Sequence, residues 1–153
     1  MTDHRATDPR VPWASRVFGF GPMLPLVAAA LGAWTMSERW GQLAVHLSII
    51  WAALILSFIG GVRRGFGFGQ DRASTPVEVL TAAAYLILAG LALVVPYWIT
   101  SLSLLIVGYA LAALLDWRGA RRGDAPAHFA RLRPPQLLLG VAALVALWAW
   151  LLA

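Results

Sequence analysis

The chain has 153 residues, of which 60% are hydrophobic and 12% are charged. A soluble domain carries about 25% charged residues, so this composition, with a mean hydropathy of +0.73, excludes an ordinary water-soluble domain and favours lipid as the solvent. The net charge is +5, but the arginines cluster between apolar runs, which argues against nucleic-acid binding. The chain has no cysteine, which excludes disulfides, thiolate catalysis, iron–sulfur clusters and Cys-based zinc sites.

The N-terminal part combines a polar tail with the first apolar run. Residues 1–16 carry arginines and aspartates, and we expect a mostly disordered cytoplasmic tail. The apolar run covers about 17–35, with Pro22 and Pro25 in its first turns, where a missing backbone donor matters least. A secretory signal peptide is the alternative. The length of the run and the lack of a small-residue cleavage site favour a retained helix.

The second and third apolar runs are separated by a polar segment. The second run, about 43–60, contains no charge and ends at the motif Gly60-Gly61-Val62-Arg63-Arg64. The third, about 77–95, follows Thr75-Pro76-Val77-Glu78. This tetrapeptide predicts a helix start, with Thr75 as the N-cap, proline at the first helical position and Glu78 closing a capping box.

Two more runs complete the pattern, at about 98–117 and 136–152. Each of the five runs is long enough to cross a hydrocarbon core of about 30 Å at about 1.5 Å per residue. Segments in lipid must be helical, because their backbone groups need internal hydrogen-bond partners. We therefore expect an all-α integral membrane protein, a compact bundle of five transmembrane helices forming a single domain over 17–153.

The distribution of arginines predicts the orientation of the bundle. The tail holds three arginines, the 61–76 segment three and the 118–135 segment five, whereas the opposite side holds Arg39. By the positive-inside rule, the N-terminus is cytoplasmic and the C-terminus periplasmic. Tryptophans near both ends of the runs fit aromatic belts at the two interfaces, with Trp51 as an exception near mid-span. These features predict a multi-pass protein of a bacterial inner membrane.

Two stripes of small and polar residues are the candidate packing faces. At 100° per residue, each stripe lies on one side of its run, with these candidate members: His46, Ser57, Gly60 and Arg64 on the second run; Glu78 and Tyr85 on the third. Small and polar faces are the ones that meet in lipid, so we expect these two helices to pack along their stripes. Gly61-x-x-x-Gly65 would add close approach if the helix continues, and Arg63, Arg64 and Glu78 would share one membrane face. The candidate packing or charge cluster at this face consists of Ser57, Gly60, Gly61, Arg63, Arg64, Glu78 and Asp116.

Three ionisable residues have both a functional and a structural interpretation. Glu78 would gate an ion or proton path, or would serve in the capping box and complement the helix dipole. His46 would ligate heme or relay protons, but no second histidine is expected at its depth, which favours a packing role. Asp116 is expected to pair with an arginine of 118–133. The sequence suggests no nucleophile–histidine–acid set, no metal site and no cofactor.

The motif Leu56-Ser57-Phe58-Ile59-Gly60-Gly61-Val62-Arg63-Arg64-Gly65 resembles the L-S-F-L-G-G-[IV]-[HR]-W-G signature of the domain of unknown function 3429 family, which is related to mitochondrial transmembrane protein 69. Gly19–Leu26 resembles the first helix of that family, and Gly108-Tyr109 to Asp116 followed by 126–133 resembles its ending. Arg64, His128-Phe129 and Pro134-Pro135 depart from the family pattern. The resemblance implies a small multi-span protein of bacterial or mitochondrial inner membranes and no particular activity.

Three hypotheses follow for function. The first is a non-enzymatic accessory or assembly partner of a membrane complex, because few polar groups lie inside the runs and several faces are small. The second is a small transporter or lipid-binding protein that uses the His46–Glu78 stripes as a polar seam. The third, an enzyme acting on lipids, lacks a catalytic constellation. Expected partners are the bilayer, other membrane proteins and, at the arginine-rich segments, anionic headgroups at about 1 kcal/mol per residue.

Overall fold

The computed structural model describes residues 17, 19–68, 75–122 and 127–153, and within these residues it is helical without a strand. The elements in chain order are a 3-10 turn η2 (Gly21–Met23), α2 (Leu24–Thr35), α3 (Glu38–Phe68), α4 (Pro76–Val94), α5 (Trp98–Arg122) and α6 (Ala127–Trp150). The expected all-α class with five helices is confirmed for this part of the chain. The tail expected at 1–16 lies outside it, as do 69–74 and 123–126 of the two arginine-rich segments.

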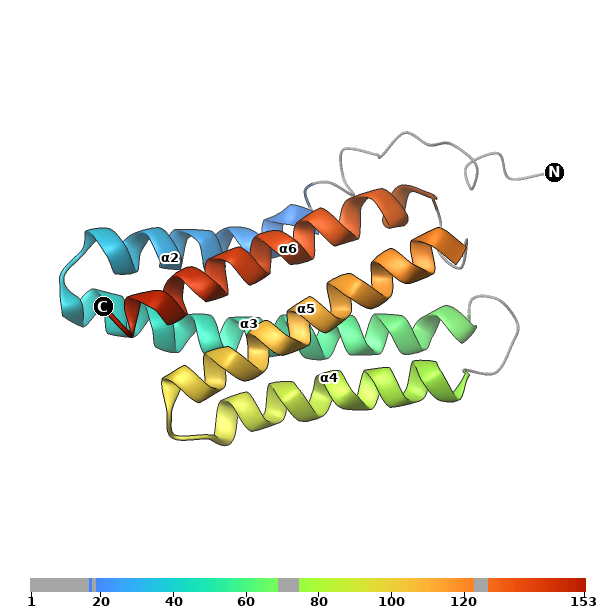
Figure 1. Ribbon diagram of the computed structural model, residues 1–153, viewed down its shortest axis with the longest axis horizontal. Helices are drawn as coiled ribbons and strands as arrows, with labels where there is room; N and C mark the ends of the chain where they lie inside the picture. The colour runs from blue at the N-terminus through green and yellow to red at the C-terminus, as the bar shows by residue number, and fades with distance from the viewer. Residues whose placement is uncertain (1–16, 18, 69–74, 123–126) are drawn as a thin grey trace.

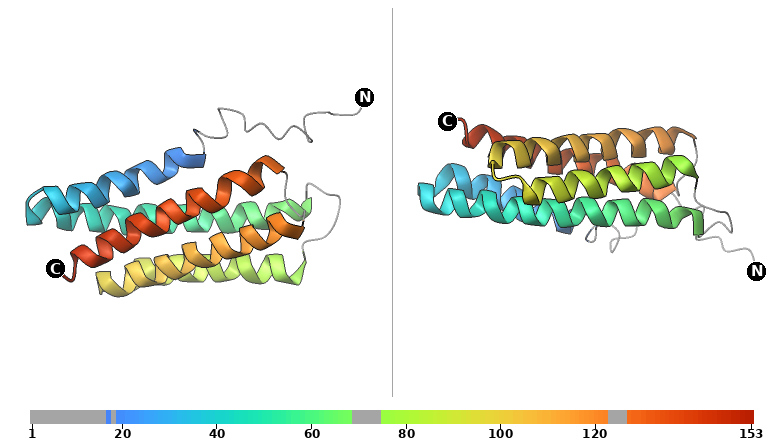
Figure 2. Two further views of the ribbon diagram at one scale, coloured as in Figure 1. Left: turned by 45° about the horizontal axis from the view of Figure 1, so that its top comes forward. Right: turned by 90° about the horizontal axis from the view of Figure 1, so that it is seen from below.

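The five helices form an up-and-down bundle (Figure 1). Each helix contacts the next one along the chain. In addition, α6 packs on α2, and α3 packs on α5. In Figure 2, α5 and α6 lie side by side, with α2 and α3 on the other side of the bundle. The end of α3, the start of α4, the end of α5 and the start of α6 therefore lie together at one end of the bundle.

Several helices are longer than the apolar runs that predicted them. α3 continues past Gly60-Gly61 to Phe68, α5 continues to Arg122, and α6 begins at Ala127 instead of near 136. Pro134 and Pro135 lie inside α6. An apolar run shows only which part of a helix can lie in lipid. The backbone hydrogen bonds of the same helix can continue for several turns into the polar sequence beyond the run.

Four of the helices are long and apolar enough to cross a membrane, as in a multi-pass membrane protein. Their membrane-length segments are Glu38–Arg64, Pro76–Val94, Trp98–Gly119 and Leu132–Trp150. The first apolar run forms the shorter apolar helix Gly21–Thr35. At about 1.5 Å per residue, this segment is too short to cross a hydrocarbon core of about 30 Å without the residues before it.

The start of α4 confirms the predicted capping box. The Thr75 hydroxyl accepts from the Glu78 backbone N–H at 3.3 Å, and the Thr75 N–H donates to a Glu78 carboxylate oxygen at 2.8 Å. Pro76 occupies the first turn, where it loses no helical hydrogen bond. Glu78 therefore serves the structural role that the capping interpretation gives it.

The centre of the bundle is built from leucine, alanine and two buried tyrosines. Tyr109 of α5 donates its hydroxyl hydrogen to the carbonyl of Ala52 in α3 at 3.2 Å. Its ring lies against Gly140 of α6, where a Cβ would stand 2.9 Å from two ring carbons and 3.0 Å from the sulfur of Met23. Gly140 thus lets η2, α5 and α6 meet around one aromatic ring.

Candidate functional site

A cluster of charged side chains, Arg63, Asp116 and Arg133, lies at the end of the bundle where α3 and α5 end and α6 begins. Arg63 of α3 donates from Nη1 to Oδ1 of Asp116 in α5 at 2.9 Å. Nε of Arg133 in α6 stands 3.3 Å from Oδ2 of the same carboxylate. The side chains of Arg63, Asp116 and Arg133 are 16%, 10% and 11% exposed. We call these three residues the arginine–aspartate cluster.

The sequence predicted part of this cluster. The expected pairing of Asp116 with an arginine of 118–133 is confirmed by Arg133. The sequence also placed Arg63 and Asp116 in one candidate packing or charge cluster, but it predicted no ion pair between these two residues. The two residues lie more than fifty positions apart, and their contact depends on α3 packing against α5, which no local pattern reveals.

The cluster has more hydrogen-bond donors than acceptors. Each guanidinium carries five N–H donors, whereas one carboxylate offers two oxygens. Within the described part of the chain, Nε of Arg63, Oδ2 of Asp116 and the hydroxyl of Tyr85 are buried without a hydrogen-bond partner, so the cluster leaves both a donor and an acceptor unpaired. Tyr85 is fully buried on α4, where its Cβ would stand 3.5 Å from a Cβ at Gly60, three residues before Arg63 in α3.

The charge balance of the cluster is also uneven. Among the residues that the structure describes, two guanidinium groups share one carboxylate, so these three nearly buried side chains together carry one positive charge. Removing a charge from water costs several kcal/mol unless an opposite charge compensates it. Such an arrangement ties α3, α5 and α6 together.

The predicted contact between the second and third runs, which are α3 and α4, is present near Gly60. A Cβ at Gly60 of α3 would stand 3.2 Å from the carbonyl oxygen of Ala82 in α4 and 3.5 Å from Cβ of Tyr85. Gly61 is exposed, and a Cβ there would meet nothing within 4 Å in the described residues. Close packing of α3 on α4 therefore depends on the first glycine of the pair and not on the second.

The remaining candidates have other contacts. His46 is exposed, with its ring centroid 6.2 Å from that of Trp98 at the start of α5, and the polar seam from Tyr85 to His46 stays a prediction. The Ser57 hydroxyl donates to the carbonyl of Ala53 at 2.9 Å within its own helix, and Arg64 is exposed.

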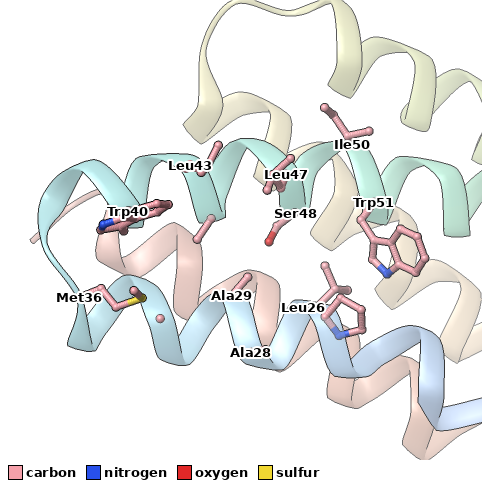
Figure 3. A pocket seen from close by; sticks show the side chains of 13 residues that line it. Leu26, Ala28, Ala29, Met36, Trp40, Leu43, Leu47, Ser48, Ile50 and Trp51 are labelled. Atoms are coloured by element: carbon pink, nitrogen blue, oxygen red, sulfur yellow. The ribbon is translucent and has the colours of Figure 1, made fainter.

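An apolar groove of about 490 Å³ runs between α2 and α3. Figure 3 shows Met36 and Trp40 at one end, Trp51 at the other, and the Ser48 hydroxyl pointing between the helices. The Ser48 oxygen is buried without a hydrogen-bond partner in the described residues. Trp51, the exception among the aromatic belts, donates its indole N–H to the carbonyl of Pro22 at 2.8 Å. Sequence patterns identified neither Ser48 nor this groove.

These features define an all-helical protein with four membrane-length helices, held together at one end by shared ion pairs. The chain belongs to the family described as Protein of unknown function (DUF3429), whose model matches residues 11–152. This membership confirms the resemblance of the Leu56–Gly65 motif. The chain matches no curated protein and no solved structure.

Proposed function

We propose that this protein is a multi-pass protein of the bacterial inner membrane that acts through contacts, as a non-enzymatic accessory or assembly partner of a membrane complex. The observation that carries this proposal is the position of α4. Only 17% of its membrane-length segment is buried, against 33% to 44% in the other three. α4 packs on α3 and α5 and directs most of its surface away from the bundle.

The outer face of α4 has the composition of a helix-packing surface. Ala83 and Gly90 are exposed, and a Cβ at Gly90 would meet nothing within 4 Å among the described residues. Leu80, Ile87 and Val94 are exposed beside them. Small residues let a second backbone approach closely, and such approach drives helix association in lipid. A transmembrane helix of another protein is the partner that this face fits.

The alternative of transport through the expected seam has less support. Polar and ionisable groups inside the membrane mark transport pathways, whereas α3 and α4 pack closely at Gly60 and Ala82. Lipid binding is a second candidate function. The α2–α3 groove favours it, because its apolar lining suits an alkyl chain of a membrane lipid.

The proposed orientation places the arginine–aspartate cluster on the cytoplasmic side. Exposed Arg64, Arg118 and Arg121 lie at that end of the bundle, and the guanidinium of Arg121 stacks on the Trp117 ring at 3.8 Å. Arginine with tryptophan at one level is typical of the interface between headgroups and hydrocarbon. This end is where we expect anionic headgroups to gather.

The contact proposal is tested by affinity purification in mild detergent. We expect a stoichiometric membrane protein to co-purify with the unaltered chain and to be lost with Gly90→Trp. Leu138→Trp on the exposed side of α6 is the matched control and should retain the partner. Absence of a co-purifying protein, or equal loss in both variants, would refute the role of α4.

The orientation is tested separately, which is simple because the chain has no native cysteine. Ser37→Cys and Arg118→Cys place single thiols at exposed positions near opposite ends of the bundle. A membrane-impermeant maleimide added to intact spheroplasts should label Ser37→Cys and leave Arg118→Cys unlabelled. The reverse pattern would overturn the orientation.

A further inference from the structure

The hydroxyl group of Ser48 differs from the other serine hydroxyls within the helices. Ser57 and Ser103 donate to the carbonyl four residues earlier in their own helices, at 2.9 and 2.8 Å, which is a common way to satisfy a helical serine. Ser48 is 3% exposed, and its oxygen has no partner among the described residues. It points into the space between α2 and α3 (Figure 3). Since an unpaired buried hydroxyl is costly, a ligand that accepts its proton would be held there.

The α2–α3 groove has the size and the lining of a ligand site. Its volume of about 490 Å³ falls within the range of about 300–1,000 Å³ that is typical of small-molecule sites. The indole N–H of Trp51 is already bonded to the carbonyl of Pro22, so its ring is fixed in the wall and offers apolar surface to the groove. Leu47 and Trp51 are 54% and 40% exposed, which leaves the groove open to the side, where lipid surrounds a membrane helix.

Three common occupants do not suit the Ser48 hydroxyl. A buried water needs two to four polar partners, and the apolar lining does not supply them. Ser48 lies three residues from Trp51, the middle of the segment Glu38–Arg64, which is about 4–5 Å along the axis. The oxygens of a phospholipid lie at the interface, about 15 Å from the middle of the hydrocarbon core, so its alkyl chains bring no acceptor to this depth. A transmembrane helix has its carbonyls bonded internally.

The chemistry of the groove selects a neutral, apolar molecule with a carbonyl oxygen. A carbonyl accepts the Ser48 proton and brings no donor of its own. A lipid alcohol would bring a second O–H into an apolar lining, and buried donors without a partner are rarer in proteins than acceptors without one. A planar ring would in addition gain contact with the fixed indole of Trp51, because aromatic and other flat rings stack or pack edge to face.

We propose that the α2–α3 groove binds the ring of a prenylated quinone, with one ring carbonyl accepting a hydrogen bond from Ser48 and the ring lying against Trp51. The prenyl tail leaves through the open side of the groove into lipid. This assignment names the lipid class for the lipid-binding function given above and rests on that function. It does not depend on the contact role of α4.

The test uses the full-length protein in a neutral detergent, with the thermal unfolding temperature as the readout. The probe is decylubiquinone, a benzoquinone with a decyl tail. Decylbenzene has the same tail on a ring without carbonyls, and short-chain phosphatidylcholine supplies alkyl chains alone. A ligand that binds the folded protein raises its unfolding temperature with concentration. We expect such a rise with decylubiquinone that exceeds the rise with either of the other two compounds.

Two pairs of variants locate the site. Ser48→Ala should weaken the apparent affinity for decylubiquinone about three- to tenfold, which is the worth of one neutral hydrogen bond, whereas Ser57→Ala on the same helix should leave it unaltered. Ala29→Phe fills the groove and should abolish binding, whereas Ala110→Phe at an exposed position of α5 should not. Without ligand, Ser48→Ala should unfold at no lower temperature than the unaltered chain, because it removes an unpaired buried hydroxyl.

The results that would overturn the proposal separate it from lipid binding in general. Equal rises with decylubiquinone and decylbenzene, or a rise with phosphatidylcholine alone, would refute the quinone assignment and leave lipid binding in place. No rise with any of the three compounds would refute both. Equal weakening by Ser48→Ala and Ser57→Ala would remove the Ser48 hydroxyl from the site. A lower unfolding temperature of unliganded Ser48→Ala would show that this hydroxyl already has a partner in the chain.

Discussion

Adding one methyl group at Gly140 tests how tightly the centre of the bundle is packed. In Gly140→Ala, the new Cβ would stand 2.9 Å from two carbons of the Tyr109 ring and 3.0 Å from the Met23 sulfur. The ring has little room to move, because Tyr109 is fully buried and its hydroxyl is bonded to the carbonyl of Ala52. Insertion of a methyl group into a well-packed core costs about 1–3 kcal/mol.

Helix propensity opposes this cost, since alanine is more favourable than glycine by about 1 kcal/mol in a helix interior. The net destabilisation expected for Gly140→Ala is therefore about 0–2 kcal/mol. Gly90→Ala is the matched control on α4, where a Cβ would meet nothing within 4 Å in the described residues. Gly90→Ala should raise the free energy of unfolding by about 1 kcal/mol through helix propensity alone. The two variants should thus differ in unfolding free energy by about 1–3 kcal/mol.

The assay is reversible unfolding of the purified protein from neutral micelles with sodium dodecyl sulfate, followed by fluorescence of its eight tryptophans. Both variants would be measured at the same micelle composition, so the difference between them isolates the packing cost. Equal stability of Gly140→Ala and Gly90→Ala would refute the reasoning, because it would mean that η2, α5 and α6 do not meet tightly around the Tyr109 ring.

Three further predictions use the same unfolding assay. Gly60→Leu should lower the free energy of unfolding by about 2 kcal/mol or more, because a side chain there meets the Ala82 backbone. Gly61→Leu should leave the free energy of unfolding nearly unchanged. Equal destabilisation by the two substitutions would contradict the α3–α4 contact. Thr75→Ala should lower the free energy of unfolding by about 1 kcal/mol, because the capping box is lost. An unchanged free energy of unfolding would show that the capping box does not stabilise α4. Asp116→Asn should lower the free energy of unfolding by about 3–5 kcal/mol, because two nearly buried guanidinium groups lose their carboxylate. A change within about 0.5 kcal/mol, which is typical of surface sites, would show that water solvates the cluster.

Sequence reasoning was most successful where one local property decides the outcome. The five helices follow from apolar runs, because a backbone in lipid has no alternative to helical hydrogen bonding. The α4 capping box follows from four consecutive residues, with Thr75 and Glu78 in their required places. The pairing of Asp116 with Arg133 was predictable because the two residues flank one short connection between neighbouring helices.

Prediction was least successful where the result depends on which helices become neighbours. A stripe calculated at 100° per residue assumes one partner along the whole helix, whereas α3 packs on α2, α4 and α5 and Gly41 also lies against the Trp150 ring of α6. His46 lies beside Trp98 of α5, and Arg63 pairs with Asp116 of α5. The groove beside Ser48 depends on the separation of two helices, which composition does not encode.

The two prolines inside α6 divide one continuous helix into two hydrogen-bonding units. Pro134 and Pro135 have no N–H, so the carbonyls four residues earlier, at 130 and 131, lack their usual helical donors. The turns from 127 to 133 are therefore joined to the membrane-length part of α6 by two fewer backbone hydrogen bonds than in a regular helix. In amide hydrogen exchange, these turns should open at a lower free energy than the turns after Gln136, and Arg133 is the residue that fastens them to Asp116.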